Sequence, residues 1–146
     1  ADLANENVMT VARGETLPEA AHLMHEAHVG DLVVVDEQDE RRPVGILTDR
    51  DLVMAIAEHG IEHFARRKVE QEMSDVLIMA RSQDPVDDVL QNMRDNGVRR
   101  IPVVDVDDEL VGILTLDDLL GYYGDAVMKM GELVQKGLTR EITGKG

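Results

Sequence analysis

The strongest constraint on the fold is an internal repeat. Segment Val44–Leu52 (Val-Gly-Ile-Leu-Thr-Asp-Arg-Asp-Leu) recurs in the second half of the chain as Val111–Leu119, with seven of the nine positions identical. Upstream, an apolar stripe with the i, i+3, i+4, i+7 spacing of an amphipathic helix begins at Leu17 and recurs from Val86. A unit of about 50 residues is marginal for a core of its own. The repeat therefore predicts two copies that pack on each other about a pseudo-twofold axis.

Both copies predict the order β-α-β-β-α, which places the chain in the α/β (α+β) class. Each copy begins with a short strand, around Val11 in the first and at 76–79 in the second. A helix starts after Thr16-Leu17-Pro18-Glu19 in the first copy and after Asp84-Pro85 in the second, and both are good N-terminal signals. Two strands and a second helix complete each copy, and we expect the copies to pack through their sheets.

The same reading divides the chain into four segments. They are the first repeat at 7–60, a charged and partly helical linker at 61–72, the second repeat at 73–124, and a C-terminal segment at 125–146. In that last segment Val127, Met130, Leu133 and Val134 predict one more short amphipathic helix. A loose tail is expected from Gly137 onward.

Composition excludes several classes of function. The 146 residues carry a formal net charge of −15, which repels nucleic acid and anionic membrane surfaces. The chain has no cysteine, so it contains no disulfide, thiolate nucleophile or cysteine-ligated zinc. Its longest apolar runs are the length of a strand, and no signal-peptide pattern opens the chain. We expect a cytoplasmic protein that binds neither nucleic acid nor membrane.

The repeated segments resemble a tandem pair of CBS domains, also called a Bateman module, in a stand-alone protein. The resemblance covers Asn7 to Gly124. It is carried by the repeated Gly-Ile-Leu-Thr-x-x-Asp-Leu, by the strands that end at Asp36 and Asp105, and by Val8-Met9-Thr10 and Met73-Ser74. It implies a homodimer that holds an adenosine-containing ligand, such as AMP, ADP, ATP or NAD, between the repeats. The implied role is regulatory, for example energy sensing, with a change in dimer packing passed to an unidentified effector protein.

The Thr-x-x-Asp motif in each copy is the candidate ribose site. Thr48 and Asp51, like Thr115 and Asp118, lie where a strand passes into a helix. The carboxylate can accept hydrogen bonds from the two ribose hydroxyls, while the helix N-terminus faces a phosphate. The alternative is a helix cap, with threonine as the capping residue and aspartate complementing the dipole.

Arginines are the candidate phosphate ligands. Arg99 and Arg100 occupy the position where nucleotide-binding relatives of the resembled family often carry a His-Arg pair, although both could be surface cations. The first copy has Gly30 and Asp31 instead, which favours one occupied site or a ligand with fewer phosphates. Arg50 either supplies a cation to the first site or pairs on the surface with a nearby acid.

Further residues are expected to form the wall of the cleft between the repeats, namely Thr10, Leu32, Ser74, Val76, Ile101 and Pro102. Metal binding is not predicted, because His22, His25 and His28 spread over about 120° of helix, too wide for one ion. No catalytic motif or catalytic cofactor is indicated. The alternative to a nucleotide sensor is a non-catalytic dimerisation scaffold with vestigial clefts.

Overall fold

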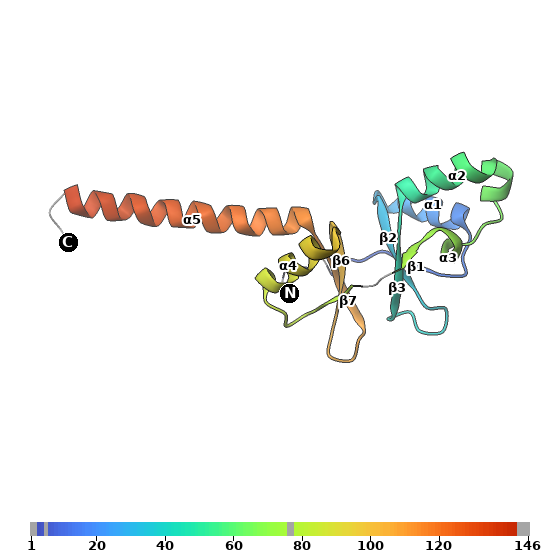
Figure 1. Ribbon diagram of the computed structural model, residues 1–146, viewed down its shortest axis with the longest axis horizontal. Coiled ribbons are helices and arrows are strands. Elements are labelled where there is room, and N and C mark those ends of the chain that lie inside the picture. Colours follow the sequence, from blue (N-terminus) through green and yellow to red (C-terminus); the bar gives the residue numbers. More distant parts are fainter. Residues whose placement is uncertain (1–2, 5, 76–77, 143–146) are drawn as a thin grey trace.

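The chain folds as two similar α/β units whose sheets face each other (Figure 1). The computed structural model describes residues 3–4, 6–75 and 78–142. The first unit contains β1 (Thr10–Ala12), α1 (Leu17–Ala27), β2 (Asp31–Val35), β3 (Pro43–Thr48) and α2 (Asp49–Phe64). The segment α3 (Val69–Glu72) and β4 (Ser74–Asp75) follows. The second unit contains β5 (Ala80–Arg81), α4 (Val86–Asn96), β6 (Arg100–Val104), β7 (Leu110–Thr115) and α5 (Leu116–Ile142).

The two sheets have the same topology, which confirms the predicted β-α-β-β-α repeat. In each, the first strand pairs parallel with the second and the second pairs antiparallel with the third. Val11 lies opposite Val34 in the first unit, as Ala80 lies opposite Val103 in the second. Strand β4 adds a fourth strand to the first sheet by pairing with β3. The chain thus completes the first sheet before it enters the second unit.

Strand alternation divides the apolar side chains among three cores. Leu32 and Val34 point toward α1 and α2 in the first unit, while Ile101 and Val103 belong to the core of the second. The intervening Val33 and Val35 pack between the two sheets against Ile113, Val8 and Leu110. This third core confirms that the repeats pack through their sheets.

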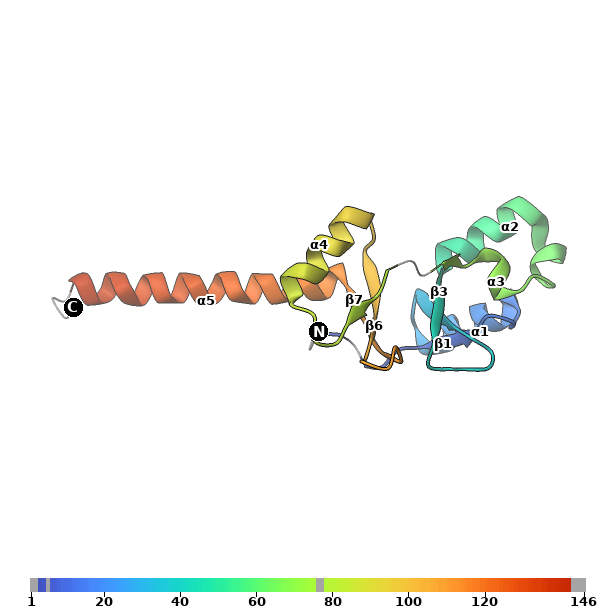
Figure 2. The same ribbon diagram turned by 60° about the horizontal axis from the view of Figure 1, so that its bottom comes forward.

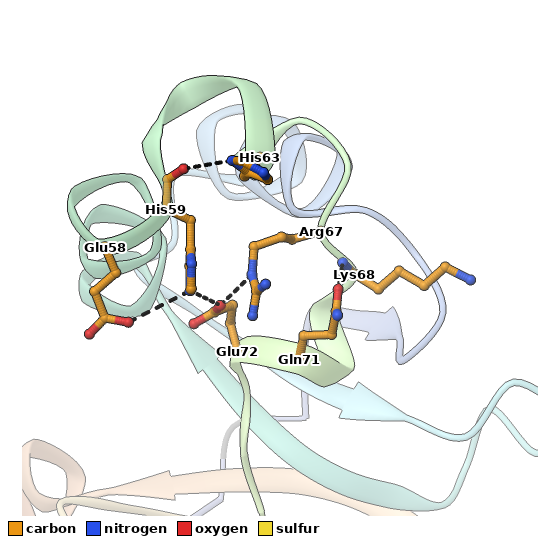
Figure 3. A network of polar contacts seen from close by, with 7 residues as sticks. All are labelled: Glu58, His59, His63, Arg67, Lys68, Gln71 and Glu72. Carbon is orange, nitrogen blue, oxygen red and sulfur yellow. Dashed lines mark hydrogen bonds and ion pairs between the residues drawn. The ribbon is translucent and has the colours of Figure 1, made fainter.

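The linker predicted at 61–72 packs onto the first unit. Helix α2 changes direction at Gly60, whose φ of 79° places it in the left-handed region that glycine tolerates. Farther on, Arg67 Nε donates to Glu72 Oε1 at 2.6 Å, and His59 Nε2 lies 3.5 Å from the same carboxylate oxygen (Figure 3). These contacts hold α3 against the end of α2.

Two predicted elements differ from the structure. The first strand of the second unit is Ala80–Arg81, which is later in the chain than the predicted 76–79. The reason is that the buried Ala80 is the counterpart of Val11. Ala80 pairs with Val103 of β6, as Val11 pairs with the equivalent residue of β2. The predicted short C-terminal helix is instead the continuation of α5, which runs unbroken from Leu116 to Ile142. The boundary predicted between 124 and 125 therefore falls inside a helix, and so do residues 137–142 of the expected loose tail. Residues 143–146 lie outside the described part of the chain.

Helix α5 leaves the body of the molecule after its first turns and extends alone (Figures 1 and 2). Leu119 is buried in the core of the second unit, and Tyr123 packs against that core. The Tyr123 hydroxyl donates to Asp87 of α4, and this bond raises the pKa of the tyrosine to about 12. Beyond Tyr123 the same apolar stripe continues in the open, with Val127, Met130, Leu133 and Val134 between 61% and 69% exposed.

Among the described residues, no helix combines the length and the apolar composition needed to cross a membrane.

Candidate functional site

Two adjoining clefts open between the facing sheets. The first has a volume of about 350 Å³, and its lining comes from both repeats: Ile46, Thr48, Ser74, Asp75, Ile78, Asn96, Val98, Arg99, Arg100 and Pro102. The second has a volume of about 550 Å³ and is lined by Gly30, Asp31, Thr48, Asp49, Arg50, Arg99, Arg100, Thr115, Leu116 and Asp117. Thr48, Arg99 and Arg100 line both clefts, so these three residues mark their junction.

The first cleft has the character of a small-molecule site. Its wall is mainly apolar, with Ile46 and Pro102 on the strands β3 and β6 and Val98 just before β6. The polar side chains of the lining are Thr48, Ser74, Asp75, Asn96, Arg99 and Arg100. Its volume falls in the range of roughly 300–1,000 Å³ usual for small-molecule pockets. A flat heteroaromatic ring fits such a wall.

The second cleft is polar and lies beside two helix N-termini. Helix α2 begins at Asp49 and α5 begins at Leu116, and both residues line this cleft. The Asp49 amide donates to the Gly30 carbonyl at 2.9 Å, and the equivalent Leu116 amide donates to the Arg99 carbonyl at 2.8 Å. The partial positive charge of a helix N-terminus favours anions. Two helix N-termini therefore border one cleft, and their first turns also carry the acidic residues Asp49, Asp51, Asp117 and Asp118.

Both Thr-x-x-Asp motifs form capping boxes. Thr48 N–H donates to Asp51 Oδ2 at 2.8 Å, and Asp51 N–H donates back to Thr48 Oγ1 at 3.2 Å. The matching distances at Thr115 and Asp118 are 3.0 and 3.2 Å. The capping interpretation is thus confirmed in both copies. Each threonine lines a cleft and neither aspartate does, so the ribose role of the aspartates stays a prediction.

An ion pair crosses the pseudo-twofold axis between the repeats. Asp31 is the first residue of β2, and Arg100 is the first residue of β6, the equivalent strand of the second unit. On the neighbouring strands they pair with Thr48 and Thr115, which are also equivalent to each other. The Arg100 guanidinium pairs with the Asp31 carboxylate, and the two side chains are 33% and 30% exposed. At the other end of the interface Arg41 pairs with Glu109 at 3.0 Å. Arg100 therefore meets a carboxylate where the sequence predicted a phosphate.

Arg99 and Arg50 differ from Arg100 in having no acidic partner among the described residues. Within the described part of the chain, neither guanidinium forms an ion pair, and the suggested pairing of Arg50 with a neighbouring acid is not observed. Only the Arg50 backbone amide contacts Asp49, at 2.8 Å. Both arginines line the second cleft and can reach an anion there.

At the position pseudo-symmetric to the wall of the first cleft, apolar side chains pack between the two sheets. Val33 and Ile113 occupy the positions equivalent to Pro102 and Ile46, and they pack against each other together with Val8 and Val35. The equivalents of two cleft-wall residues thus belong to the core between the sheets. One occupied site per chain stays a prediction.

Several residues expected in the cleft wall lie elsewhere. Leu32 and Ile101 are 0% and 1% exposed and belong to the cores of their own units, so their assignment to the cleft wall is wrong. The reason is strand alternation, which turns Pro102 toward the cleft and its neighbour Ile101 away. Thr10 lies on β1 and lines neither cleft. Val76 lies outside the described residues, while Ser74 is in the lining as expected.

Sequence reasoning missed much of the apolar wall, namely Ile46, Ile78 and Val98, and also the polar residues Asp75 and Asn96. Ile46 could have been found, because it sits in the repeated Gly-Ile-Leu-Thr segment two positions before Thr48 and so shares its strand face. No cluster of three or more metal-ligating side chains occurs among the described residues.

The clefts and the repeated topology define a class of protein, a tandem α/β pair with two adjoining clefts between its repeats. Residues 1–58 and 67–125 each match the CBS domain, and the chain belongs to this family. An uncharacterized protein of Methanopyrus kandleri is 36% identical over 121 residues, which are 82% of this chain and 59% of that protein. The chain thus spans less than two thirds of the length of that relative.

Solved CBS domain structures share the fold. The CBS domain protein of Pyrobaculum aerophilum complexed with AMP has a TM-score of 0.71 and 25% identity, over 81% of this chain and 87% of its own. A CBS domain pair in complex with 5′-methylthioadenosine and S-adenosyl-L-methionine has a TM-score of 0.70 and 28% identity, over 86% and 94%. The cytosolic domain of the Mg²⁺ channel MgtE in complex with ATP has a TM-score of 0.68 and 28% identity, over 82% and 46%.

Proposed function

We propose that this chain is a non-catalytic regulatory module that binds one adenosine-containing ligand between its repeats. The observation that carries the proposal is the junction of two unlike clefts, one apolar and sized for a base, the other polar and lined by arginines and two helix N-termini. A nucleotide has the same two halves. The AMP, S-adenosylmethionine and ATP complexes of structurally similar CBS proteins support this ligand class.

The ribose of such a ligand lies at Thr48 and Asp51. Thr48 lines both clefts, and the ribose must lie where the base-binding cleft meets the phosphate-binding cleft. Asp51 uses Oδ2 for the cap, and its Oδ1 accepts no hydrogen bond from the described residues. Although Asp51 lines neither cleft, its side chain is hydrogen-bonded to the cleft residue Thr48, and we assign this oxygen to a ribose hydroxyl. The equivalent Thr115 reaches only the second cleft, so Asp118 serves as a cap alone.

The ribose assignment predicts unequal effects of two matched variants. Asp51→Asn keeps a capping oxygen and removes the charge, and we expect adenosine to bind about tenfold more weakly, because a charge-assisted hydrogen bond becomes a neutral one. Asp118→Asn makes the same change in the other capping box and should leave affinity within about twofold of the unmodified chain. Calorimetry measures both, with 2′,3′-dideoxyadenosine as the ligand that lacks the hydroxyls. Equal affinities in the two variants would refute the assignment.

For ligand binding to act as a signal, the chain must contact another protein chain, and we propose that this is a second copy of itself. The exposed stripe of α5 continues the stripe that is buried against the second unit, so its apolar side chains need a cover. A ligand that binds one packing of the dimer better than another shifts the population toward it. An effector protein then reads the change in packing.

A scaffold without a ligand is the second candidate. The observation that favours it is the Arg100–Asp31 ion pair, in which the predicted phosphate ligand Arg100 is already bound to a carboxylate. A thermal-shift series with adenosine compounds separates the candidates, because a ligand that binds the folded state alone raises the melting temperature.

A further inference from the structure

We propose that Asp31 determines how many phosphates the ligand carries. It competes with the ligand for Arg100, so the site selects adenosine compounds of low negative charge, such as AMP or an uncharged derivative, over ATP. This inference rests on the proposed nucleotide site. It assigns a specificity role to a residue of the first repeat that does not line the base-binding cleft.

The position of Asp31 gives it this role. It begins β2 at the point equivalent to Arg100 on β6, and the pseudo-twofold axis brings the two side chains together. Arg100 lines both clefts, whereas Asp31 lines only the polar one. A phosphate that enters from the base-binding cleft therefore meets Arg100 already bound to a carboxylate. It must replace that carboxylate or stay beside it.

The charges around the polar cleft are balanced. Three arginines, Arg50, Arg99 and Arg100, face three aspartates, Asp31, Asp49 and Asp117. A terminal phosphate carries about −1.5 to −2 charges at neutral pH, and each additional phosphate adds more. The guanidinium groups of Arg50 and Arg99, which form no ion pair with described residues, can compensate the negative charge of one phosphate. Further phosphates would meet the carboxylates, and like charges at short range repel.

A purely structural role explains Asp31 less well. About a third of each side chain of the pair is exposed, and ion pairs with this access to water contribute little to stability. The repeats are also held by the apolar core around Val33 and Ile113 and by the Arg41–Glu109 pair. Removal of the Asp31 charge should therefore alter ligand choice more than folding.

The test is a calorimetric series with adenosine, AMP, ADP and ATP at constant ionic strength. In the unmodified chain we expect affinity to stop rising, or to fall, beyond AMP. In Asp31→Asn we expect ATP to bind about tenfold more tightly, AMP about threefold more tightly and adenosine unchanged, because the removed charge acts only on phosphates. Asp107→Asn, in the exposed turn between β6 and β7, is the control for net charge and should give no such graded change.

A second substitution shows whether Asp31 acts through Arg100. With Arg100→Gln present, the additional change Asp31→Asn should raise ATP affinity by less than it does in the unmodified chain, because the cation for which they compete is gone. Thermal unfolding checks that each variant folds. An equal change for all four ligands, or an effect matched by Asp107→Asn, would overturn the role of Asp31 while nucleotide binding stands. Absence of binding by all four ligands in both the unmodified chain and Asp31→Asn would overturn both proposals.

Discussion

Ile46→Trp is expected to abolish adenosine binding while the chain remains folded. Ile46 is half-buried on β3 and lines the apolar cleft of about 350 Å³. An indole at this position fills the space that the adenine base needs. Loss of the burial of a base, at about 25 cal/mol per Å² of apolar surface, corresponds to roughly 100-fold or more in affinity. Fluorescence or calorimetric titration with AMP measures the loss.

A matched control separates blocking of the cleft from a general effect of tryptophan. Val106 lies in the exposed turn between β6 and β7, with 72% of its surface accessible, and it lines neither cleft. Val106→Trp should bind AMP as the unmodified chain does. Both variants should retain the far-ultraviolet circular dichroism of the parent. A folded Ile46→Trp variant with unchanged affinity would place the ligand elsewhere.

Charges introduced on the α5 stripe are expected to convert a dimer into a monomer. Val127 and Val134 are two turns apart on one face of α5, 67% and 61% exposed. Burial of such a side chain contributes about 1.5–3 kcal/mol, and a dimer about a twofold axis buries each residue twice. The double variant Val127→Asp, Val134→Asp replaces this gain with unpaired carboxylates at the interface. We expect sedimentation equilibrium to show association weakened by at least about 100-fold.

The control for this experiment is Met128→Asp. Met128 is 68% exposed but lies about 100° around the helix from Val127, away from the stripe. This variant should sediment as the unmodified chain does, which we expect to have twice the mass of the 16.2 kDa chain. A monomeric unmodified chain, or a double variant that remains dimeric, would show that the stripe is not a contact between copies.

The repeated architecture was predictable because both copies carry the same local signals. Apolar stripes, capping threonines and the Val-Gly-Ile-Leu-Thr strand act within one unit, so one sequence suffices to read them. The first strand of the second unit was misplaced because the apolar run at 76–79 gives a stronger local pattern than Ala80. Alignment of the two copies on their first helices would have located it opposite Val11. Helix α5 was cut short because its glycines weaken a helix without ending it.

The site was predictable only in part, because it forms between the units. Thr48, Arg99 and Arg100 were expected and line both clefts. The Arg100–Asp31 pair could not be read from the sequence, since it depends on how two strands of different repeats meet at the axis. The packing of Val33 and Ile113 between the sheets has the same origin. Tertiary packing decides both features.

The most direct test of the central claim is a calorimetric titration of the nucleotide-free chain with AMP at physiological salt. The proposed site predicts saturable micromolar binding with one ligand per chain, because Val33 and Ile113, the equivalents of the cleft-wall residues Pro102 and Ile46, are buried between the sheets. The titration is repeated with adenosine, ATP and S-adenosylmethionine. Two ligands per chain would contradict the asymmetry of the clefts. Absence of binding by all four compounds would contradict the nucleotide site itself and leave the dimer surfaces as the functional part of the molecule.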